Sequence, residues 1–136
     1  MPVEAVMEYE RIWIEGLNSG DISVADAVFA SDCVIHITGV PAPFQGVSSW
    51  KEFVAGLLKA FPDIHFTIED QFVQGDRAAF RWRATATHTG PLGAVPPTGK
   101  KVAVDGLILD RTVGGKVQER FEQWDQSIML QQLGLA

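Results

Sequence analysis

The last third of the chain gathers charged and aromatic residues into one short segment. Residues 117–125 read Val-Gln-Glu-Arg-Phe-Glu-Gln-Trp-Asp, one residue after a Gly-Gly turn at 114–115. Side chains of a strand alternate between its two faces, so Arg120, Glu122 and Trp124 share one side. A carboxylate beside an arginine and an indole ring is costly in an ordinary core, and it is typical of the wall of a small-molecule pocket.

General acid–base catalysis is the chemistry that these residue types favour. An apolar neighbour raises the pKa of a carboxyl group by desolvation, whereas an arginine lowers it. A Glu122 carboxylate tuned in this way can remove a proton from a carbon next to a carbonyl. The alternative is an ordinary surface salt bridge between Arg120 and Glu122. Asp125 ends the strand, where we expect it to be the N-cap of a following helix.

Other side chains could complete such a pocket. His88 ends the apolar face of a predicted strand that also carries Phe80 and Trp82, and it is equally well explained as a structural histidine. His36 poses the same choice in a shorter predicted strand. Trp82 and Trp124 are predicted core residues, and the same rings could stack on a flat hydrophobic ligand.

Several other kinds of site have no signature in the sequence. The three histidines stand far apart without HxH or HExxH spacing, so no metal site is predicted. Phosphate-binding, dinucleotide-binding and nucleophile-elbow motifs are missing. Cys33, the one cysteine, cannot form an internal disulfide, and we expect it to be buried packing rather than a nucleophile.

Length and composition set the outer limits. With 136 residues, 46% of them hydrophobic, the chain is predicted to form one domain, residues 1–136, around a single core. A net charge of −6 argues against nucleic acid or an anionic membrane as partner. No apolar run approaches the about 20 residues that span a bilayer. The start of the chain lacks signal-peptide features and the lone cysteine suits a reducing compartment, so we expect a cytoplasmic protein.

The elements that must position these residues follow from hydrophobic periodicity. Helices are predicted over residues 3–18, 23–30 and 49–60, the first with Val3, Val6 and Met7 on its apolar face. Strands are predicted over residues 33–37, 64–73, 77–89, 102–111 and 117–125, and residues 126–134 form a short helix or tail. The result is an α+β domain of three helices on a curved, mostly antiparallel sheet, with a cleft between the layers.

Short segments distributed along the chain resemble a known family in both order and spacing. They are Phe-Pro-Asp at 61–63, Gly-Asp at 75–76, Thr-His-Thr-Gly at 87–90, Pro-Pro-Thr-Gly-Lys at 96–100, and the stretch from Gly-Lys-Val to Gln-Gln-Leu-Gly at 115–134. Together they resemble the SnoaL-like polyketide cyclase (ester cyclase) branch of the NTF2-like superfamily. The resemblance covers nearly the whole chain, and it is specific for the branch rather than for a substrate.

The resemblance implies a cone-shaped α+β barrel with helices on the concave side of the sheet, an apolar cavity between them, and a homodimer formed through the sheet. Characterised cyclases of this branch close a ring by intramolecular aldol condensation of a polyketide ester, without cofactor or metal. One carboxylate on the last strand is their acid/base, and the matching motif places it at Glu122, with Asp125 as second choice. The family motif has aspartate in place of Glu122, and residues 107–109 are apolar where a polar partner such as histidine is expected.

These observations support three hypotheses. The first is a cofactor-free cyclase or isomerase acting on a hydrophobic, polyketide-like carbonyl compound, with Glu122 as acid/base and His88 and His36 orienting the substrate. The second is a non-catalytic protein that binds a hydrophobic ligand. The third is an epoxide-hydrolase-like enzyme, in which Glu122, Arg120 and Asp105 would surround a water. The residues predicted to form the pocket wall are Trp124, Trp82, Arg120, Phe44, Phe80 and Ile108.

Overall fold

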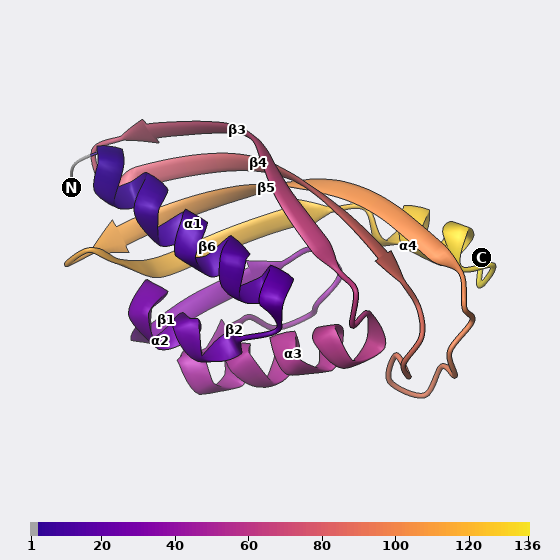
Figure 1. Ribbon diagram of the computed structural model, residues 1–136. Coiled ribbons are helices and arrows are strands. Elements are labelled where there is room, and N and C mark those ends of the chain that lie inside the picture. Colours follow the sequence, from indigo (N-terminus) through magenta and orange to yellow (C-terminus); the bar gives the residue numbers. More distant parts are fainter. Residues whose placement is uncertain (1–2) are drawn as a thin grey trace.

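A curved sheet, covered on one face by helices, organises the chain (Figure 1). The computed structural model describes residues 3–136, with side chains from Glu8 onward. Val3, Val6 and Met7, which were predicted to lie on the apolar face of the first helix, are outside the described side chains. The elements run in the order α1 (Val3–Ser19), η1 (Ile22–Val24), α2 (Ala25–Val28), β1 (Phe29–Ile37), β2 (Phe44–Gln45), α3 (Val47–Ala60), β3 (His65–Gln74), β4 (Arg77–Thr87), β5 (Lys101–Val113), β6 (Lys116–Trp124) and α4 (Gln126–Gln132).

Within residues 3–136 the strands form one six-stranded sheet in the order β2-β1-β6-β5-β4-β3. Neighbouring strands are antiparallel except β1 and β6, which run parallel. Two hairpins, β3–β4 and β5–β6, therefore make up most of the sheet, and the first strand of the chain joins it beside the last. The predicted α+β class with a mostly antiparallel sheet is confirmed.

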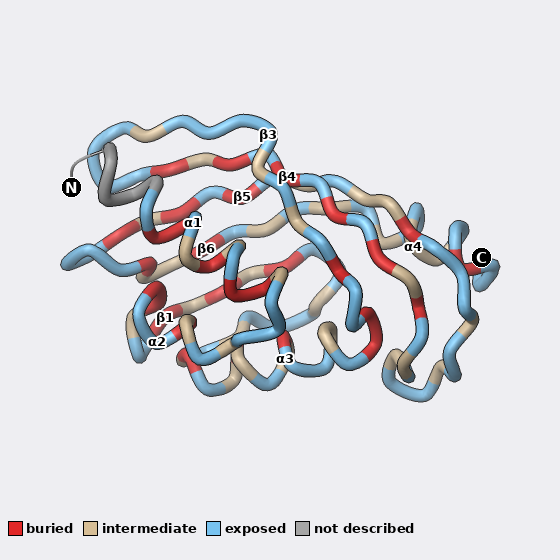
Figure 2. Tube along the Cα trace, in the orientation of Figure 1, coloured by how far each residue is buried: buried red, intermediate tan, exposed pale blue. Residues whose placement is uncertain are grey.

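The core lies between the sheet and the helices α1 and α3, which cover its concave face (Figure 1). Trp13 of α1 and Trp50 of α3 are both buried, and Trp13 packs edge-on against Phe29 with 5.0 Å between ring centroids. Buried and more exposed residues alternate along β4 (Figure 2). The predicted inward face of that strand, which carries Phe80 and Trp82, is confirmed.

The segment before the first strand differs from the prediction. Residues 23–30 were predicted to be one helix, but the helical turns η1 and α2 end at Val28 and β1 begins at Phe29. Phe29 is buried and pairs with Val117 of β6. Pairing with a strand almost ninety residues later therefore overrides the local helical pattern. The turn begins at Asp21, whose side chain accepts a hydrogen bond from the Ser23 N–H group at 3.1 Å.

Candidate active site

Two cross-strand rows of inward-facing residues form the sheet side of the site. In the first row, Gly106 of β5 is paired with Trp82 of β4 on one side and with Trp124 of β6 on the other. In the next row, Glu122 of β6 is paired with Ile108 of β5. The glycine at the centre of the first row has no side chain, and the Trp82 indole packs into the place where its Cβ atom would lie.

Arg120 occupies the row beyond Glu122, as a fully buried guanidinium held by two carboxylates. Its Nε and Nη2 atoms each donate to Asp110 at 2.8 Å, and Nη2 also donates to Glu10 of α1 at 2.7 Å. Tyr9 donates a further hydrogen bond of 2.8 Å to Asp110. A surface salt bridge between Arg120 and Glu122 was one reading of the sequence. The two groups do form an ion pair at 3.7 Å, but its surface location is wrong, because Arg120 is 0% exposed and its hydrogen bonds go to the other two carboxylates.

Glu122 is the carboxylate with the weakest pairing in this group. Its Oε1 lies 3.7 Å from Nη1 of Arg120, which is longer than a hydrogen bond, and its side chain is 15% exposed. Burial raises the pKa of Glu122 to about 7, although Arg120 acts in the opposite direction. Burial also raises the pKa of Glu10. Glu122 can therefore gain or lose a proton near neutral pH.

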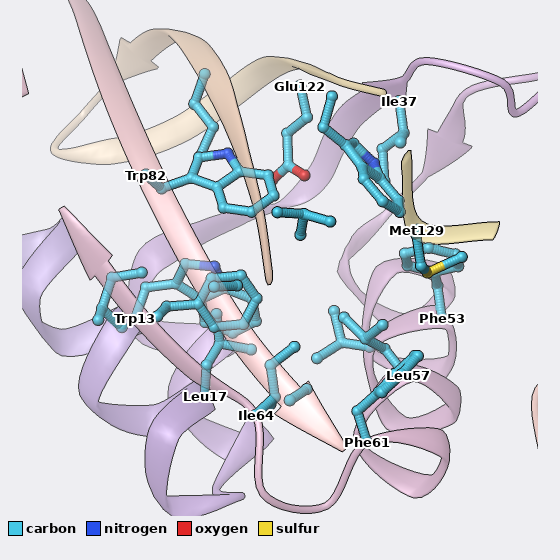
Figure 3. A pocket seen from close by; sticks show the side chains of 18 of the residues that line it. Trp13, Leu17, Ile37, Phe53, Leu57, Phe61, Ile64, Trp82, Glu122 and Met129 are labelled. Atoms are coloured by element: carbon cyan, nitrogen blue, oxygen red, sulfur yellow. The ribbon is translucent and has the colours of Figure 1, made fainter. Parts of the chain in front are cut away.

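Both glutamates line a cavity of about 100 Å³ between the sheet and the helices. The Glu122 carboxylate projects into it (Figure 3). Among the described residues around this cavity, only Glu10 and Glu122 carry charge. The aromatic part of the wall consists of Trp13, Trp50, Phe53, Phe61, Phe66, Trp82 and Trp124. Such apolar surroundings disfavour an ionised carboxylate, which is the physical cause of the raised pKa.

Three of the predicted wall residues, Trp82, Trp124 and Ile108, line the cavity together with Glu122. The alternation that placed Glu122 and Trp124 on one face of β6 is thus confirmed. Arg120 lies behind the wall, as the counter-ion of Glu10.

Phe80 and Phe44 lie behind the cavity wall rather than in it. The Phe80 ring packs edge-on against Tyr9 with 6.3 Å between centroids. Phe44 packs against Trp50 and Phe53, with centroid distances of 5.8 Å and 4.7 Å. Both phenylalanines therefore support residues next to the cavity without lining it.

The structure does not bring His36 or His88 to the cavity. His36 stacks on Phe121 with 4.3 Å between centroids, and its Nε2 lies 2.9 Å from a Glu119 carboxylate oxygen. This pair belongs to the outer face of the sheet. His88 is fully buried past the end of β4, where its Nδ1 accepts a hydrogen bond of 3.2 Å from the Thr98 N–H group. Neither histidine lines the cavity, so neither is placed to orient a substrate there.

Two aspartates considered from the sequence also lie elsewhere. Asp125 is the N-cap of α4, as predicted, and accepts a hydrogen bond of 2.9 Å from the Ser127 N–H group. Hydrogen bonds from Ser127 lower the pKa of Asp125, which makes it a poor second choice as acid/base. Asp105 is exposed and does not line the cavity, so it cannot serve the epoxide-hydrolase arrangement.

Sequence reasoning missed Asp110 and Glu10, the two carboxylates that do surround the arginine. Asp110 follows Ile108 by two residues on the inward face of β5, so the strand alternation contained a signal for it. Glu10 lies 110 residues from Arg120 in the chain, and no local pattern connects the two.

The described part of the chain shows neither a metal-binding cluster nor a membrane-spanning helix. No group of three or more histidine, cysteine, aspartate or glutamate side chains there could hold a metal ion. Among the helices described, none is both long and apolar enough to cross a membrane.

Comparisons with known proteins identify the family of the chain and its fold. The family model described as SnoaL-like polyketide cyclase matches residues 5–133. Wild-type IdmH from Streptomyces antibioticus, a candidate polyketide cyclase, is 29% identical with a TM-score of 0.83, over 95% of this chain and 98% of that one. A candidate polyketide cyclase from Acidithiobacillus ferrooxidans is 28% identical with a TM-score of 0.80, over 100% of both chains.

A third solved structure supports the fold alone. A candidate SnoaL-like polyketide cyclase from Jannaschia sp. CCS1 has a TM-score of 0.89 at 21% identity, over 100% of this chain and 96% of that one. Among curated protein sequences, none matched the chain. The NTF2-like fold expected from the sequence is confirmed by these likenesses.

Proposed function

The chain belongs to the SnoaL-like polyketide cyclase family, and on that premise we propose that it is a cofactor-independent enzyme of the cyclase or isomerase type. Its substrate is a small hydrophobic carbonyl compound, and Glu122 is the acid/base. One observation carries this proposal: the Glu122 carboxylate projects into an otherwise largely apolar cavity, where its pKa is about 7.

The reaction begins when ionised Glu122 takes a proton from the carbon next to the carbonyl group. The electrons of the broken C–H bond form the enolate. If the substrate is an unsaturated ketone, the enolate is conjugated with the C=C bond, and returning the proton to the far carbon of that system gives an isomer. Alternatively, the enolate carbon attacks a second carbonyl of the same molecule, which closes a ring, and the new alkoxide takes its proton from Glu122. Either route regenerates the carboxylate, so no cofactor is consumed.

The pKa of Glu122 suits both halves of this cycle. A general base works best when its pKa lies near the operating pH, because it must accept the proton and then return it. Asp110 and Glu10 bind Arg120 directly, whereas Glu122 remains 3.7 Å from the guanidinium. Because Asp110 and Glu10 take the hydrogen bonds of Arg120, the guanidinium does not keep Glu122 permanently ionised, as it would in a close salt bridge.

The size of the cavity limits the substrate. Its volume of about 100 Å³ is smaller than the about 150 Å³ of an engineered protein cavity that holds benzene. It is well below the roughly 300–1,000 Å³ of pockets for drug-sized ligands. Small ketones and short dicarbonyl compounds are therefore better candidates than a polycyclic polyketide.

Exchange of solvent deuterium into the α-carbon of small ketones tests the proposal. Wild-type protein is expected to catalyse exchange, followed by NMR, and Glu122→Gln is expected to lose at least about 10²-fold of the rate, as when a general base is removed. Glu119→Gln is the matched control, because Glu119 lies on the same strand but pairs with His36 on the outer face. Equal rates in wild type and Glu122→Gln would eliminate Glu122 as the base.

The pH dependence of exchange tests Glu122 as the base, and two other outcomes would favour the alternative functions. If Glu122 is the base, the exchange rate rises with pH as this carboxyl loses its proton around pH 7. Saturable ketone binding without exchange in wild type would favour the non-catalytic ligand-binding alternative. Hydration of small epoxides without ketone exchange would favour the hydrolase.

A further inference from the structure

Negative charge exceeds positive charge in the buried cluster beside the cavity. Three carboxylates surround one guanidinium, and they belong to Asp110, Glu10 and Glu122. The first two accept the hydrogen bonds of Arg120, whereas Glu122 lies 3.7 Å from it and has no closer cationic partner among the described residues. A buried charge is costly unless an opposite charge balances it. The excess can be balanced by a proton on Glu122 or by a cation in the cavity.

The cavity in front of Glu122 has an aromatic wall. All four tryptophans of the chain line the cavity into which its carboxylate projects (Figure 3). They are Trp13 of α1, Trp50 of α3, Trp82 of β4 and Trp124 of β6. Rings therefore border the cavity from the helices and from the sheet. Indole is the aromatic group that attracts cations most strongly, and aromatic cages of this kind recognise methylated ammonium groups.

The polar groups of the cavity restrict which cation it can hold. A primary ammonium has three N–H donors, each of which needs an acceptor. Among the described residues that line the cavity, Glu10 and Glu122 carry the only carboxylates, and Glu10 already binds Arg120 at 2.7 Å. A tertiary or quaternary ammonium donates one hydrogen bond or none, and its methyl groups contact the apolar wall. The cavity volume of about 100 Å³ limits this cation to a compact head group.

We propose that the cavity binds a small methylated ammonium cation, with the ionised Glu122 carboxylate as its counter-ion and the surrounding indoles as its cage. This inference goes beyond the proposed function and does not depend on it, because it concerns equilibrium binding and no reaction step. If the protein does catalyse α-proton exchange, such a cation competes with the ketone for the same cavity.

Tetramethylammonium and tert-butanol test the proposal, because they have similar size and shape but only the first is charged. Titrations followed by tryptophan fluorescence at a pH of about 8 should give at least about tenfold tighter binding of tetramethylammonium, as expected for one desolvated cation–π contact. The affinity for the cation should fall as the pH drops through about 7, because Glu122 then takes up a proton. Equal affinities for the two ligands, or no saturable binding of the cation, would overturn the proposal.

Glu122→Gln removes the proposed counter-ion and keeps the shape of the side chain. It should lower the affinity for tetramethylammonium at least about tenfold at a pH of about 8 and remove most of the pH dependence. Glu119→Gln is the matched control, because it changes the net charge equally but lies on the outer face, paired with His36. Equal losses in both variants would indicate general attraction to a protein of net charge −6 and reject the site. An unchanged pH dependence in Glu122→Gln would reject Glu122 as counter-ion.

Trp124→Leu tests the aromatic cage. Trp124 is half-buried and lies two residues after Glu122 on the same face of β6. The substitution should lower the affinity for tetramethylammonium about fivefold, through the lost cation–π contact, and should change that for tert-butanol much less. Equal losses for both ligands would reject the indole as part of a cation cage.

The cation site and the proposed function can fail separately. Binding of tetramethylammonium that depends on Glu122, without α-deuterium exchange in small ketones, would reject the proposed function and keep the cation site. Exchange that depends on Glu122, with no preference for tetramethylammonium over tert-butanol, would reject the cation site and keep the function.

Discussion

Replacing Glu122 with glutamine should make the protein more stable at pH values where the carboxyl is ionised. Burial raises the pKa of Glu122 from 4.5 to about 7, so the folded protein holds this proton more tightly than the unfolded chain does. The stability that proton binding contributes is fully present below pH 4.5, and it is lost as the pH rises through about 7. Above that range the folded protein carries the full cost of a buried, ionised Glu122.

The difference between the two pKa values sets the size of the effect. One pKa unit corresponds to about 1.4 kcal/mol. Ionisation of Glu122 should therefore lower the free energy of unfolding of the wild type by about 3 kcal/mol between pH 4.5 and pH 8. Glutamine has nearly the same shape and no charge. The stability of Glu122→Gln relative to wild type should rise by this amount across the same range.

Urea unfolding followed by tryptophan fluorescence at several pH values measures this difference. Glu10 is present in both proteins, and its repulsion of the Glu122 carboxylate is part of the raised pKa of Glu122 that the comparison measures. Glu52→Gln, on the exposed surface of α3, is the control and should follow the wild type throughout. Parallel curves for wild type and Glu122→Gln from pH 4.5 to pH 8 would refute the reasoning, because burial would then not disfavour the ionised carboxylate.

Two further predictions concern residues outside the cavity. Asp125→Ala should lower the free energy of unfolding slightly, because the N-cap bond to Ser127 is lost. Its deuterium exchange rate should stay within about twofold of wild type, and a loss as large as that of Glu122→Gln would contradict a purely structural role. The outer sheet face exposes Leu107 and Phe121, and the family resemblance implies a homodimer through the sheet. We expect the wild type to sediment as a dimer and Leu107→Asp as a monomer, since an unpaired charge is costly in an interface; a monomeric wild type would contradict this.

The strand that carries the acid/base could be predicted because the information is local. Alternation places Arg120, Glu122 and Trp124 on one face, whatever covers that face. The same rule could not place His36. In β1 both faces carry apolar residues, and the parallel pairing with β6 decides which of them is buried. The pairing partner lies more than eighty residues later in the chain, so the pattern within β1 contains no information about it.

The environment of Arg120 shows the same limit. Asp110 continues the alternation after Ile108, but the apolar run at residues 107–109 led us to expect a strand without a polar partner. Glu10 reaches Arg120 only because α1 packs across the sheet. The hydrophobic periodicity of α1 does not indicate that an arginine lies beneath this helix. A buried ion pair between distant elements becomes visible only when the register of the sheet and the position of the helix are both known.

The position of Glu122 is not explained by stability. A buried arginine needs anionic partners, and Asp110 and Glu10 already supply three hydrogen bonds to Arg120. Glu122 adds little pairing at 3.7 Å, yet its carboxylate still carries the cost of desolvation. An apolar residue would complete this wall at lower cost, as Ile108 does in the same row. A carboxylate that lowers the stability of the folded protein is best explained by a ligand on which it acts. The predicted gain in stability of Glu122→Gln measures that loss directly.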